Sequence, residues 1–427
     1  MSTIAQRRLA YIASRRSQRC FISSSSFLSS PDVSSPSMAS SGMTYPTRRL
    51  ADTISAHDGS DPETRTMRRL ALSRAITLME SQSASDMKQA NLLLNHLTSQ
   101  SNARAHAADR DGRSFFRVGI AGPPGAGKST LIEKFGLYIL DKIYPQSQQD
   151  SSSVKDGEPN SSSSHHPIFA PSKLAVVCID PSSTLSGGSI LGDKTRMAHL
   201  SRHSRAFVRP SPSRGALGGI SAYTDDVVSL CQFCGYDLVV VETVGLGQAE
   251  VEISEGVDML ILIVPPGGGD ELQGIKKGIV ELSDMLVVNK ADGVLLAAAQ
   301  TTAADYRGAM SFLRQRMEGW EKPPVLLVSA KTGNGMDILW NEICRFREVT
   351  ISNGELMAKR QRQATYWMWK HVRDLIMART KSDPILRERA AVMKLALQRG
   401  QVSPRVAASE MLDSVAQTTM DEMGEIE

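Results

Sequence analysis

A glycine-rich motif of eight residues constrains the fold of this chain more than any other feature. The segment Gly122-Pro-Pro-Gly-Ala-Gly-Lys128-Ser129 has the pattern GxxxxGK[ST], and it lies between an apolar run containing Phe116 and a helical run containing Leu131. Between a strand and a helix, such glycines let successive backbone N–H groups surround phosphate oxygens. The lysine neutralises phosphate charge, and the serine hydroxyl is a ligand for Mg²⁺. The segment therefore predicts a site for a nucleoside triphosphate, formed by Gly122, Pro123, Pro124, Gly125, Ala126, Gly127, Lys128, Ser129 and Thr130.

Strand-like and helical segments alternate along most of the chain. Short runs rich in aliphatic and β-branched residues lie at 115–121, 174–180, 238–242, 259–264, 285–289 and 325–329. Helical stretches separate them, and apolar strands flanked by helices indicate an α/β fold with a mostly parallel, doubly wound sheet. Ligands of such sheets bind at the carboxyl ends of the strands. Most of the motifs below fall at those ends.

Changes in composition divide the 427 residues into four parts. We expect a disordered presequence at 1–50, a helical extension at 51–113, a nucleotide-binding domain at 114–350 and a helical C-terminal region at 351–427. A serine-rich insertion at 146–171 interrupts the nucleotide-binding domain after its first helix. It contains His165 and His166, but we interpret it as a solvated loop because low-complexity polar segments have no core to bury.

The first fifty residues have the composition of a mitochondrial presequence. They contain seven arginines, one acid and eleven serines between Ser14 and Ser37. This pattern is typical of a transit peptide, and a generic disordered basic tail is the alternative. The segment carries a net charge of +6, so the rest of the chain, out of a total of +4, carries −2. The basic isoelectric point therefore gives no reason to expect nucleic-acid binding, and no apolar run reaches the roughly 18 residues of a membrane span.

A second motif indicates which base the nucleotide carries. Asn289-Lys-Ala-Asp292 follows a strand-like run and has the pattern NKxD. The Asp292 carboxylate can accept hydrogen bonds from both the ring N–H and the exocyclic amine of guanine, a donor pair that adenine lacks. The segment Ser329-Ala-Lys331 follows the last strand-like run and provides a backbone contact to the guanine carbonyl. We therefore predict that GTP and GDP bind through Asn289, Lys290, Asp292, Ser329, Ala330 and Lys331.

Acidic residues at other strand ends are candidate magnesium ligands. Glu242-Thr-Val-Gly245 ends a buried strand and brings an acid to the metal and a glycine to the γ-phosphate. Asp180 and Asp193 follow the second strand-like run and fit direct or water-mediated ligands, with helix capping as the alternative. Leu246 stands where common small GTPases carry a water-positioning glutamine, so we expect slow hydrolysis that a partner accelerates.

Two glycine-rich segments have less specific interpretations. Residues 209–219 combine two arginines, two prolines and three glycines, which predicts a non-regular loop whose arginines can bind phosphate or an acidic partner. Residues 265–277 bring glycines and charged side chains to the start of a helix. This second segment fits a nucleotide-responsive switch or an ordinary helix N-terminus.

The cysteines and tryptophans leave alternatives open. The five scattered cysteines argue against a disulfide framework, and Cys231 and Cys234 form the only CxxC pair. A zinc site needs further ligands, so two thiols packed near a helix end is the simpler interpretation. Trp367 and Trp369 point to different faces of one helix, which allows either a subunit contact or packing within the chain.

Five segments together resemble one family. They are DPSS (180–183), GGSILGDKTRM (187–197), RPSPSRGALGG (209–219), VVVETVGLGQAE (239–250) and GGGDELQGIKKGI (267–279). They resemble the MeaB and methylmalonic aciduria type A family of P-loop GTPases over about 67–399. The resemblance implies a P-loop NTPase fold of the SIMIBI class with an N-terminal helical extension and a C-terminal helical dimerisation arm. It also implies a homodimeric chaperone that gates delivery of adenosylcobalamin from the cobalamin adenosyltransferase to methylmalonyl-CoA mutase in the mitochondrial matrix.

The resemblance also assigns residue roles. It places Mg²⁺ at Ser129, Asp193 and Glu242, with Asp180 nearby in a first switch. It implies a second switch that begins at Gly245 and a third, with Asp270, Gln273 and Lys276, that couples the GTP state to the mutase. The implied catalytic set is Lys128, Asp193, Glu242, Gly245 and Lys276. Departures from the family pattern are Leu246, Ala249, Gly268 and the serine-rich insertion, and none removes a motif residue.

Two other functions are compatible with a phosphate loop. A protein kinase would transfer the γ-phosphate to a protein, but the catalytic-loop motif HRD followed by Asn is absent from the sequence. A nickel or zinc insertion GTPase would need a cluster of metal ligands near a switch, which the Cys231 and Cys234 pair alone does not provide.

Overall fold

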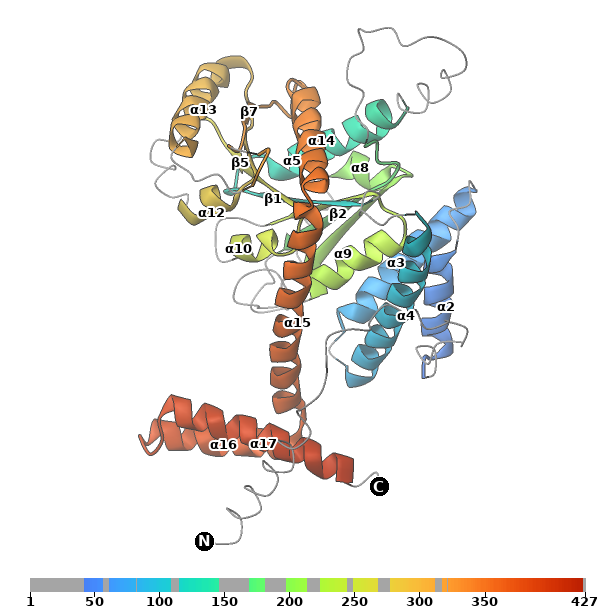
Figure 1. Cartoon of the computed structure of the whole chain (residues 1–427), viewed down its shortest axis with the longest axis vertical. Helices are drawn as coiled ribbons and strands as arrows, with labels where there is room; N and C mark the ends of the chain where they lie inside the picture. The colour runs from blue at the N-terminus through green and yellow to red at the C-terminus, as the bar shows by residue number, and fades with distance from the viewer. Residues whose placement is uncertain are drawn as a thin grey trace, which may run out of the picture. The chain divides into compact units, whose positions relative to one another are not determined.

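A parallel sheet forms the centre of the computed structural model, which describes residues 42–56, 61–81, 83–108, 115–145, 169–180, 197–212, 223–243, 249–267, 277–311, 317–320 and 322–424. The strands are β1 (Phe116–Ala121), β2 (Leu174–Asp180), β3 (Ala206–Pro212), β4 (Leu238–Glu242), β5 (Met259–Val264), β6 (Met285–Val288) and β7 (Val325–Leu327). Their order is β3-β2-β4-β1-β5-β6-β7, and each neighbouring pair is parallel. Helices lie on both faces of the sheet (Figure 1). The predicted α/β fold with a doubly wound sheet is confirmed.

Two hydrophobic layers fix the sheet between its helices. Side chains alternate along each strand, so that Val176 of β2 packs in one layer and Val177 in the other. One layer is covered by α5 (Lys128–Tyr138), its π-helical continuation η2 (Ile139–Ile143), α8 (Ala198–Arg202) and α14 (Met336–Ser352). The other is covered by α9 (Tyr223–Phe233), α10 (Ala249–Ser254), α12 (Lys277–Leu282), α13 (Leu296–Met310) and the N-terminal helices. The short η3 (Gly293–Leu295) precedes α13.

The sequence patterns do not predict the edge strand β3. Its two prolines indicated a non-regular loop from Arg209 onward, and for 209–212 this expectation is wrong. An edge strand tolerates proline because one side of its backbone needs no ladder partner. The Arg209 Nη2 atom lies 2.8 Å from Glu80 Oε2, so this arginine pairs within the chain. The remainder of the predicted loop, 213–219, lies outside the described residues.

Three helices precede the sheet: α2 (Tyr45–Ser55), α3 (Pro62–Met79) and α4 (Ala84–Ala108). Helix α3 begins with Pro62 at its first position, and the Asp61 carboxylate accepts a hydrogen bond from the Thr64 N–H at 3.1 Å. Its apolar side, with Leu72 and Ile76, is fully buried. Helix α2 begins within the range expected for the presequence, of which 1–41 lie outside the described residues.

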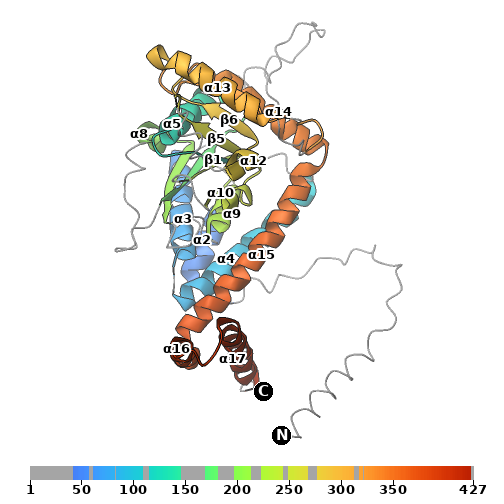
Figure 2. The same ribbon diagram turned by 90° about the vertical axis from the view of Figure 1, so that its left-hand side faces the viewer.

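The C-terminal region consists of α15 (Glu355–Ser382), α16 (Pro384–Gln398) and α17 (Pro404–Gly424). Figure 2 shows α15 leading from α14 past α9 and α4 to α16. Four residues of α15, His371, Asp374, Leu375 and Ala378, line a cavity together with residues of α4 and α9. The tryptophans of α15 lie on different faces, as predicted: Trp367 is 2% exposed and Trp369 60%. None of the described helices has the length and apolar character needed to cross a membrane.

A buried carboxylate fastens α15 to the sheet. Asp258 directly precedes β5 and is 1% exposed. Its oxygens accept hydrogen bonds from Arg117 Nη2 of β1 at 2.7 Å and from Arg360 Nη2 of α15 at 2.8 Å. Gln363 adds a hydrogen bond to the Val257 carbonyl at 2.8 Å. Although burial alone raises the pKa of Asp258, the two guanidinium groups hold it well below its usual range.

We expect Asp258→Asn to lower the free energy of unfolding by roughly 3 kcal/mol at neutral pH, because it leaves the buried guanidinium of Arg117 and the half-buried one of Arg360 without their carboxylate. A carboxylate with a lowered folded-state pKa stabilises the protein above its unfolded pKa and loses this effect as the pH falls through the folded value. The difference in the free energy of unfolding between wild type and variant should therefore be constant from about pH 5 to 8 and become smaller below about pH 4. Denaturant unfolding at several pH values measures this difference, and Asp305→Asn, which changes an exposed acid, is the control. A difference in the free energy of unfolding that stays the same in acid would contradict the prediction.

Candidate functional site

The phosphate loop connects β1 to α5, as the motif predicts. Gly122, Gly125 and Gly127 have φ angles of 149°, 81° and 85°, which L residues with side chains rarely adopt. A Cβ atom at Gly122 would lie 2.0 Å from the Ile263 carbonyl oxygen, and one at Gly127 would lie 2.6 Å from Asn289 Nδ2. The space beside Gly125 is open to 4 Å. The loop is therefore held close against β5 and Asn289.

The side chain of Lys128 lies within this loop. It is 7% exposed, and its Nζ donates hydrogen bonds to the Gly122 carbonyl at 2.7 Å and the Pro123 carbonyl at 3.2 Å. These carbonyl oxygens hold the ammonium group within the loop. Its charge is thus fixed at the loop, where it can bind phosphate oxygens.

Two predicted magnesium ligands meet at the start of α5. Ser129 Oγ donates a hydrogen bond to Glu242 Oε1 at 2.7 Å, and Glu242, at the end of β4, is 6% exposed. A hydroxyl and a carboxylate so close together form a hard oxygen donor set of the kind that Mg²⁺ prefers. These two residues therefore fit the ion. Asp180 ends β2, but the structure does not describe its side chain.

Asn289 and Lys290 connect the phosphate loop to the base-recognition loops. Asn289 Nδ2 donates to the Ala126 carbonyl at 2.9 Å, and its Oδ1 accepts from the Ala330 N–H at 3.3 Å. Lys290 has a φ of 58° and donates from Nζ to the Gly125 carbonyl at 2.7 Å. A left-handed lysine is uncommon and is found where the surrounding structure imposes it. Asn289 therefore orients two loops, a role that the sequence motif alone does not reveal.

The predicted guanine-binding carboxylate is oriented by its neighbour. Ser329 Oγ donates a hydrogen bond to Asp292 Oδ2, and Ser329 is fully buried after β7. The Asn334 carbonyl accepts from the Ser329 N–H at 3.0 Å, and the Thr332 N–H donates to Ser329 Oγ at 3.1 Å. The two motifs thus meet at the carboxyl edge of the sheet, next to the phosphate loop. Lys331 is exposed at this edge.

The sequence patterns gave no role to Gly335. Its φ is 78°, and a Cβ atom there would lie 2.3 Å from the Leu327 carbonyl oxygen. This glycine lets the chain turn tightly after Ser329 and start α14. The closely spaced Gly333 and Gly335 behind the last motif were the signal available in the sequence.

Several predicted site residues belong to ranges that the structure does not describe. Asp193, Gly245 and Lys276 lie outside the described residues, as do Leu246, Asp270 and Gln273. Thr130 is exposed on α5, one residue beyond Ser129. The described site therefore consists of the phosphate loop, Glu242 and the base-recognition loops.

The cysteine pair has the surroundings of packed thiols. Cys231 and Cys234 are 0% and 3% exposed at the end of α9. Burial raises the pKa of Cys231 well above its usual value and that of Cys234 to about 12, which disfavours the thiolates that bind metal. Within the described ranges, no group of three or more His, Cys, Asp or Glu side chains could hold a metal ion.

Comparison with protein families gives one match that spans most of the chain. The family described as "Methylmalonyl Co-A mutase-associated GTPase MeaB" matches residues 72–144 and 167–385. The break between the two ranges falls in the serine-rich insertion. The matched ranges include the phosphate loop, both base-recognition motifs and α15.

Individual proteins show the same similarity. A mouse protein named "Methylmalonic aciduria type A homolog, mitochondrial" is 39% identical over 345 residues, which are 81% of this chain and 76% of the mouse protein. The Escherichia coli protein "GTPase ArgK" is 36% identical over 299 residues, 70% of this chain and 82% of its own length. A crystal structure titled "LAO/AO transport system kinase" is similar with a TM-score of 0.56 and 26% identity, and the match covers 87% of this chain and 96% of the other.

Proposed function

The chain belongs to the MeaB family of methylmalonyl-CoA mutase-associated GTPases, and from this we propose that it is a GTP-hydrolysing chaperone of methylmalonyl-CoA mutase. The proposed role is to gate loading of adenosylcobalamin, in contact with the cobalamin adenosyltransferase, and to protect or reactivate the mutase. The observation that carries this proposal is the extent of the family match, which includes both the nucleotide site and α15. A match to the phosphate loop alone would support only nucleotide binding.

The chain is a GTP hydrolase that binds guanine nucleotide, in keeping with its family and its relatives. We infer that Lys128 binds the phosphates, that Asp292 selects guanine, and that Ser129 and Glu242 hold Mg²⁺ together with Asp180 and Asp193. The ion would neutralise charge on the phosphate oxygens. Support comes from the 2.7 Å hydrogen bond between Ser129 and Glu242 and from the fixed ammonium group of Lys128. The catalytic roles of Asp193, Gly245 and Lys276, and the third switch at Asp270 and Gln273, rest on the family resemblance.

We propose that the C-terminal helices form a homodimer contact. Met368, Val372 and Leu375 follow one another at helical spacing on α15 and are 49%, 38% and 50% exposed. Trp369 extends this apolar stripe with 60% exposure. Monomers rarely leave contiguous apolar surface of this kind in water, and tryptophan is enriched at the centre of interfaces.

Trp369→Glu should shift the protein from dimer to monomer. Losing a central aromatic contact typically weakens association by roughly thirtyfold or more, and a buried charge adds to the loss. Light scattering after size-exclusion chromatography measures the mass at several concentrations. The control is Ile338→Glu, which replaces an apolar residue on α14 that is 52% exposed. If the two variants have the same mass in solution, the role of Trp369 in the dimer is contradicted.

We place the protein in the mitochondrial matrix. The basic, serine-rich first fifty residues support this location, as do relatives whose names include "mitochondrial". Import of the full chain into isolated mitochondria, with shortening of its N-terminus, is the expected result.

The proposed chaperone role is tested with purified methylmalonyl-CoA mutase. We expect the full chain to bind the mutase in a GTP-dependent manner and its GTP turnover to rise by roughly tenfold or more, because a partner can supply the transition-state contacts that a slow GTPase lacks. The Lys128→Ala variant controls for nucleotide-independent binding. If the mutase is not bound and GTP turnover is not stimulated, the proposed role is refuted. Transfer of labelled γ-phosphate to the mutase would favour the kinase alternative.

A further inference from the structure

A cavity of about 220 Å³ lies where α15 passes α4 and α9 (Figure 2). Helix α3 contributes its last residue, Met79, to the lining. The lining comes from these four helices and includes no residue of the phosphate loop or of the base-recognition loops. The cavity is therefore separate from the nucleotide site.

Apolar side chains form most of the cavity wall. Met87, Ala90 and Leu94 face it from α4, and Leu375 and Ala378 face it from α15. On both helices the lining positions follow the spacing i, i+3, i+4, i+7, so each helix presents one continuous face to the cavity. An apolar cavity of roughly 150 Å³ holds a benzene ring, and this cavity has room for a ring with a short side chain.

One carboxylate on the cavity wall has no partner. Asp226 lies in the first turn of α9, and it forms no hydrogen bond or ion pair with any part of the chain that the structure describes. Its neighbour Asp225 differs, because Arg117 Nη1 lies 4.0 Å from Asp225 Oδ1. Burial raises the pKa of Asp226 to about 7, and the charge of Asp225 adds to this shift. The ionised form of Asp226 thus lacks a stabilising cation.

The other polar groups of the wall supply no such cation. The described lining residues include two acids, Asp226 and Asp374, and no lysine or arginine. Burial lowers the pKa of His371, so its imidazole is neutral at neutral pH and can accept a hydrogen bond. The adjacent Lys370 on α15 pairs with Glu252 at 3.0 Å. The wall therefore carries a negative charge that grows as Asp226 ionises.

We propose that this cavity binds a small organic ammonium ion that has an apolar body, with the ammonium group beside Asp226 and the body between α4 and α15. Small-molecule sites are lined mostly by apolar side chains, and a few polar groups fix the orientation of the ligand. An ammonium group gives Asp226 a charge-assisted hydrogen bond, and Asp374 and His371 can accept its other N–H groups. The site is independent of the proposed chaperone role.

Three probes with similar apolar bodies test the proposal: 2-phenylethylamine, which is a cation at neutral pH, the neutral 2-phenylethanol and the anion phenylacetate. Each is titrated into the full chain at pH 8 and constant ionic strength, with GDP and Mg²⁺ saturating the nucleotide site. We expect saturable heat and a rise in melting temperature with the amine, because a ligand that binds the native state stabilises it. The alcohol should bind roughly tenfold more weakly or worse, and phenylacetate more weakly still. No saturable binding of the amine, or equal binding of the amine and the alcohol, would overturn the proposal.

The affinity for the amine should depend on pH. It should be roughly tenfold higher at pH 8 than at pH 6, because Asp226 must lose its proton before it can pair with the ammonium group. The other titratable groups around it are Tyr223 and Asp225 of α9, with Arg117 of β1 beside Asp225, and His371 and Asp374 of α15. The lining residues of α3 and α4 do not ionise. The affinity for 2-phenylethanol should stay constant over this range, and an equal change for both probes would contradict the pairing with Asp226.

Two variants locate the ligand within the cavity. Asp226→Asn should weaken binding of the amine by roughly tenfold or more and remove its pH dependence, while the weaker binding of the alcohol stays unchanged. The control Asp305→Asn changes an exposed acid on α13 and should bind as the wild type does. Ala378→Phe places a ring in the cavity from an exposed position of α15, so it should abolish binding of both probes, and it serves if Asp226→Asn does not fold. Unchanged binding of the amine by either folded variant would overturn the proposal.

Discussion

In the Lys128→Ala variant, we expect GTP hydrolysis to fall by roughly a thousandfold or more. The Lys128 ammonium group is buried in the phosphate loop and held by two carbonyl oxygens, so it is already positioned before nucleotide binds. A fixed charge of this kind stabilises a transition state without reorganisation, and its removal costs several kcal/mol of that stabilisation. Release of phosphate under saturating GTP is the measurement.

Two controls make this result specific to the site. Lys134→Ala removes an exposed lysine from the same helix and should leave turnover unchanged. Because Lys128 also ties Gly122 and Pro123 together, a melting curve of each variant separates loss of chemistry from loss of fold. Turnover close to that of the wild type in a folded Lys128→Ala protein would refute the assignment.

We expect Asp292→Asn to reduce GTP affinity by roughly a hundredfold. The carboxylate can accept two charge-assisted hydrogen bonds from guanine, and an asparagine at this place offers an N–H group to a base that presents donors. Xanthine carries a carbonyl oxygen in place of the exocyclic amine of guanine, so xanthosine triphosphate should bind the variant better than GTP does. Competition of both nucleotides against a fluorescent GDP analogue measures the change.

The matched control for the base-recognition site is Asp337→Asn, an exposed acid in the first turn of α14. It should keep the preference for guanine. In the Asp292→Asn variant, the hydroxyl of Ser329 can still donate a hydrogen bond to the amide oxygen of the introduced side chain, so the loop should remain folded. Unchanged guanine selectivity in Asp292→Asn would refute the role of this residue.

Contiguous motifs were predictable from the sequence because their geometry is local. The phosphate loop needs only a strand, three glycines and a helix in succession, and the structure has β1, Gly122, Gly125, Gly127 and α5 in that order. The NKxD and Ser329 motifs follow β6 and β7, which are neighbours in the sheet. Parallel neighbouring strands bring such motifs to one edge.

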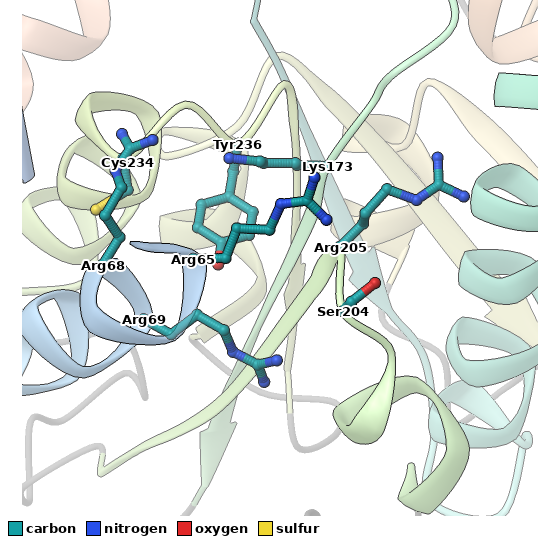
Figure 3. A pocket seen from close by; sticks show the side chains of 8 residues that line it. All are labelled: Arg65, Arg68, Arg69, Lys173, Ser204, Arg205, Cys234 and Tyr236. Atoms are coloured by element: carbon teal, nitrogen blue, oxygen red, sulfur yellow. The ribbon is translucent and has the colours of Figure 1, made fainter. Parts of the chain in front are cut away.

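Long-range contacts were not predictable in the same way. The hydrogen bond from Asn289 to the Ala126 carbonyl joins residues 163 positions apart, and no local pattern encodes it. The sequence did not predict strand β3 because its two prolines indicate a loop. Proline is compatible with a strand at the edge of a sheet, and the sequence does not show that β3 lies there. The strand order β3-β2-β4 brings Arg205, Lys173 and Tyr236 to the lining of one pocket (Figure 3), although they are distant in sequence.

The strand β5 connects the C-terminal helix α15 to the phosphate loop. Its six residues span roughly 20 Å. Asp258 at one end holds Arg360 of α15, and the Ile263 carbonyl near the other end lies against Gly122. The long helix α15 and the phosphate loop thus contact opposite ends of the same strand. A bound molecule that displaces α15 would therefore act on a strand that also contacts the phosphate loop.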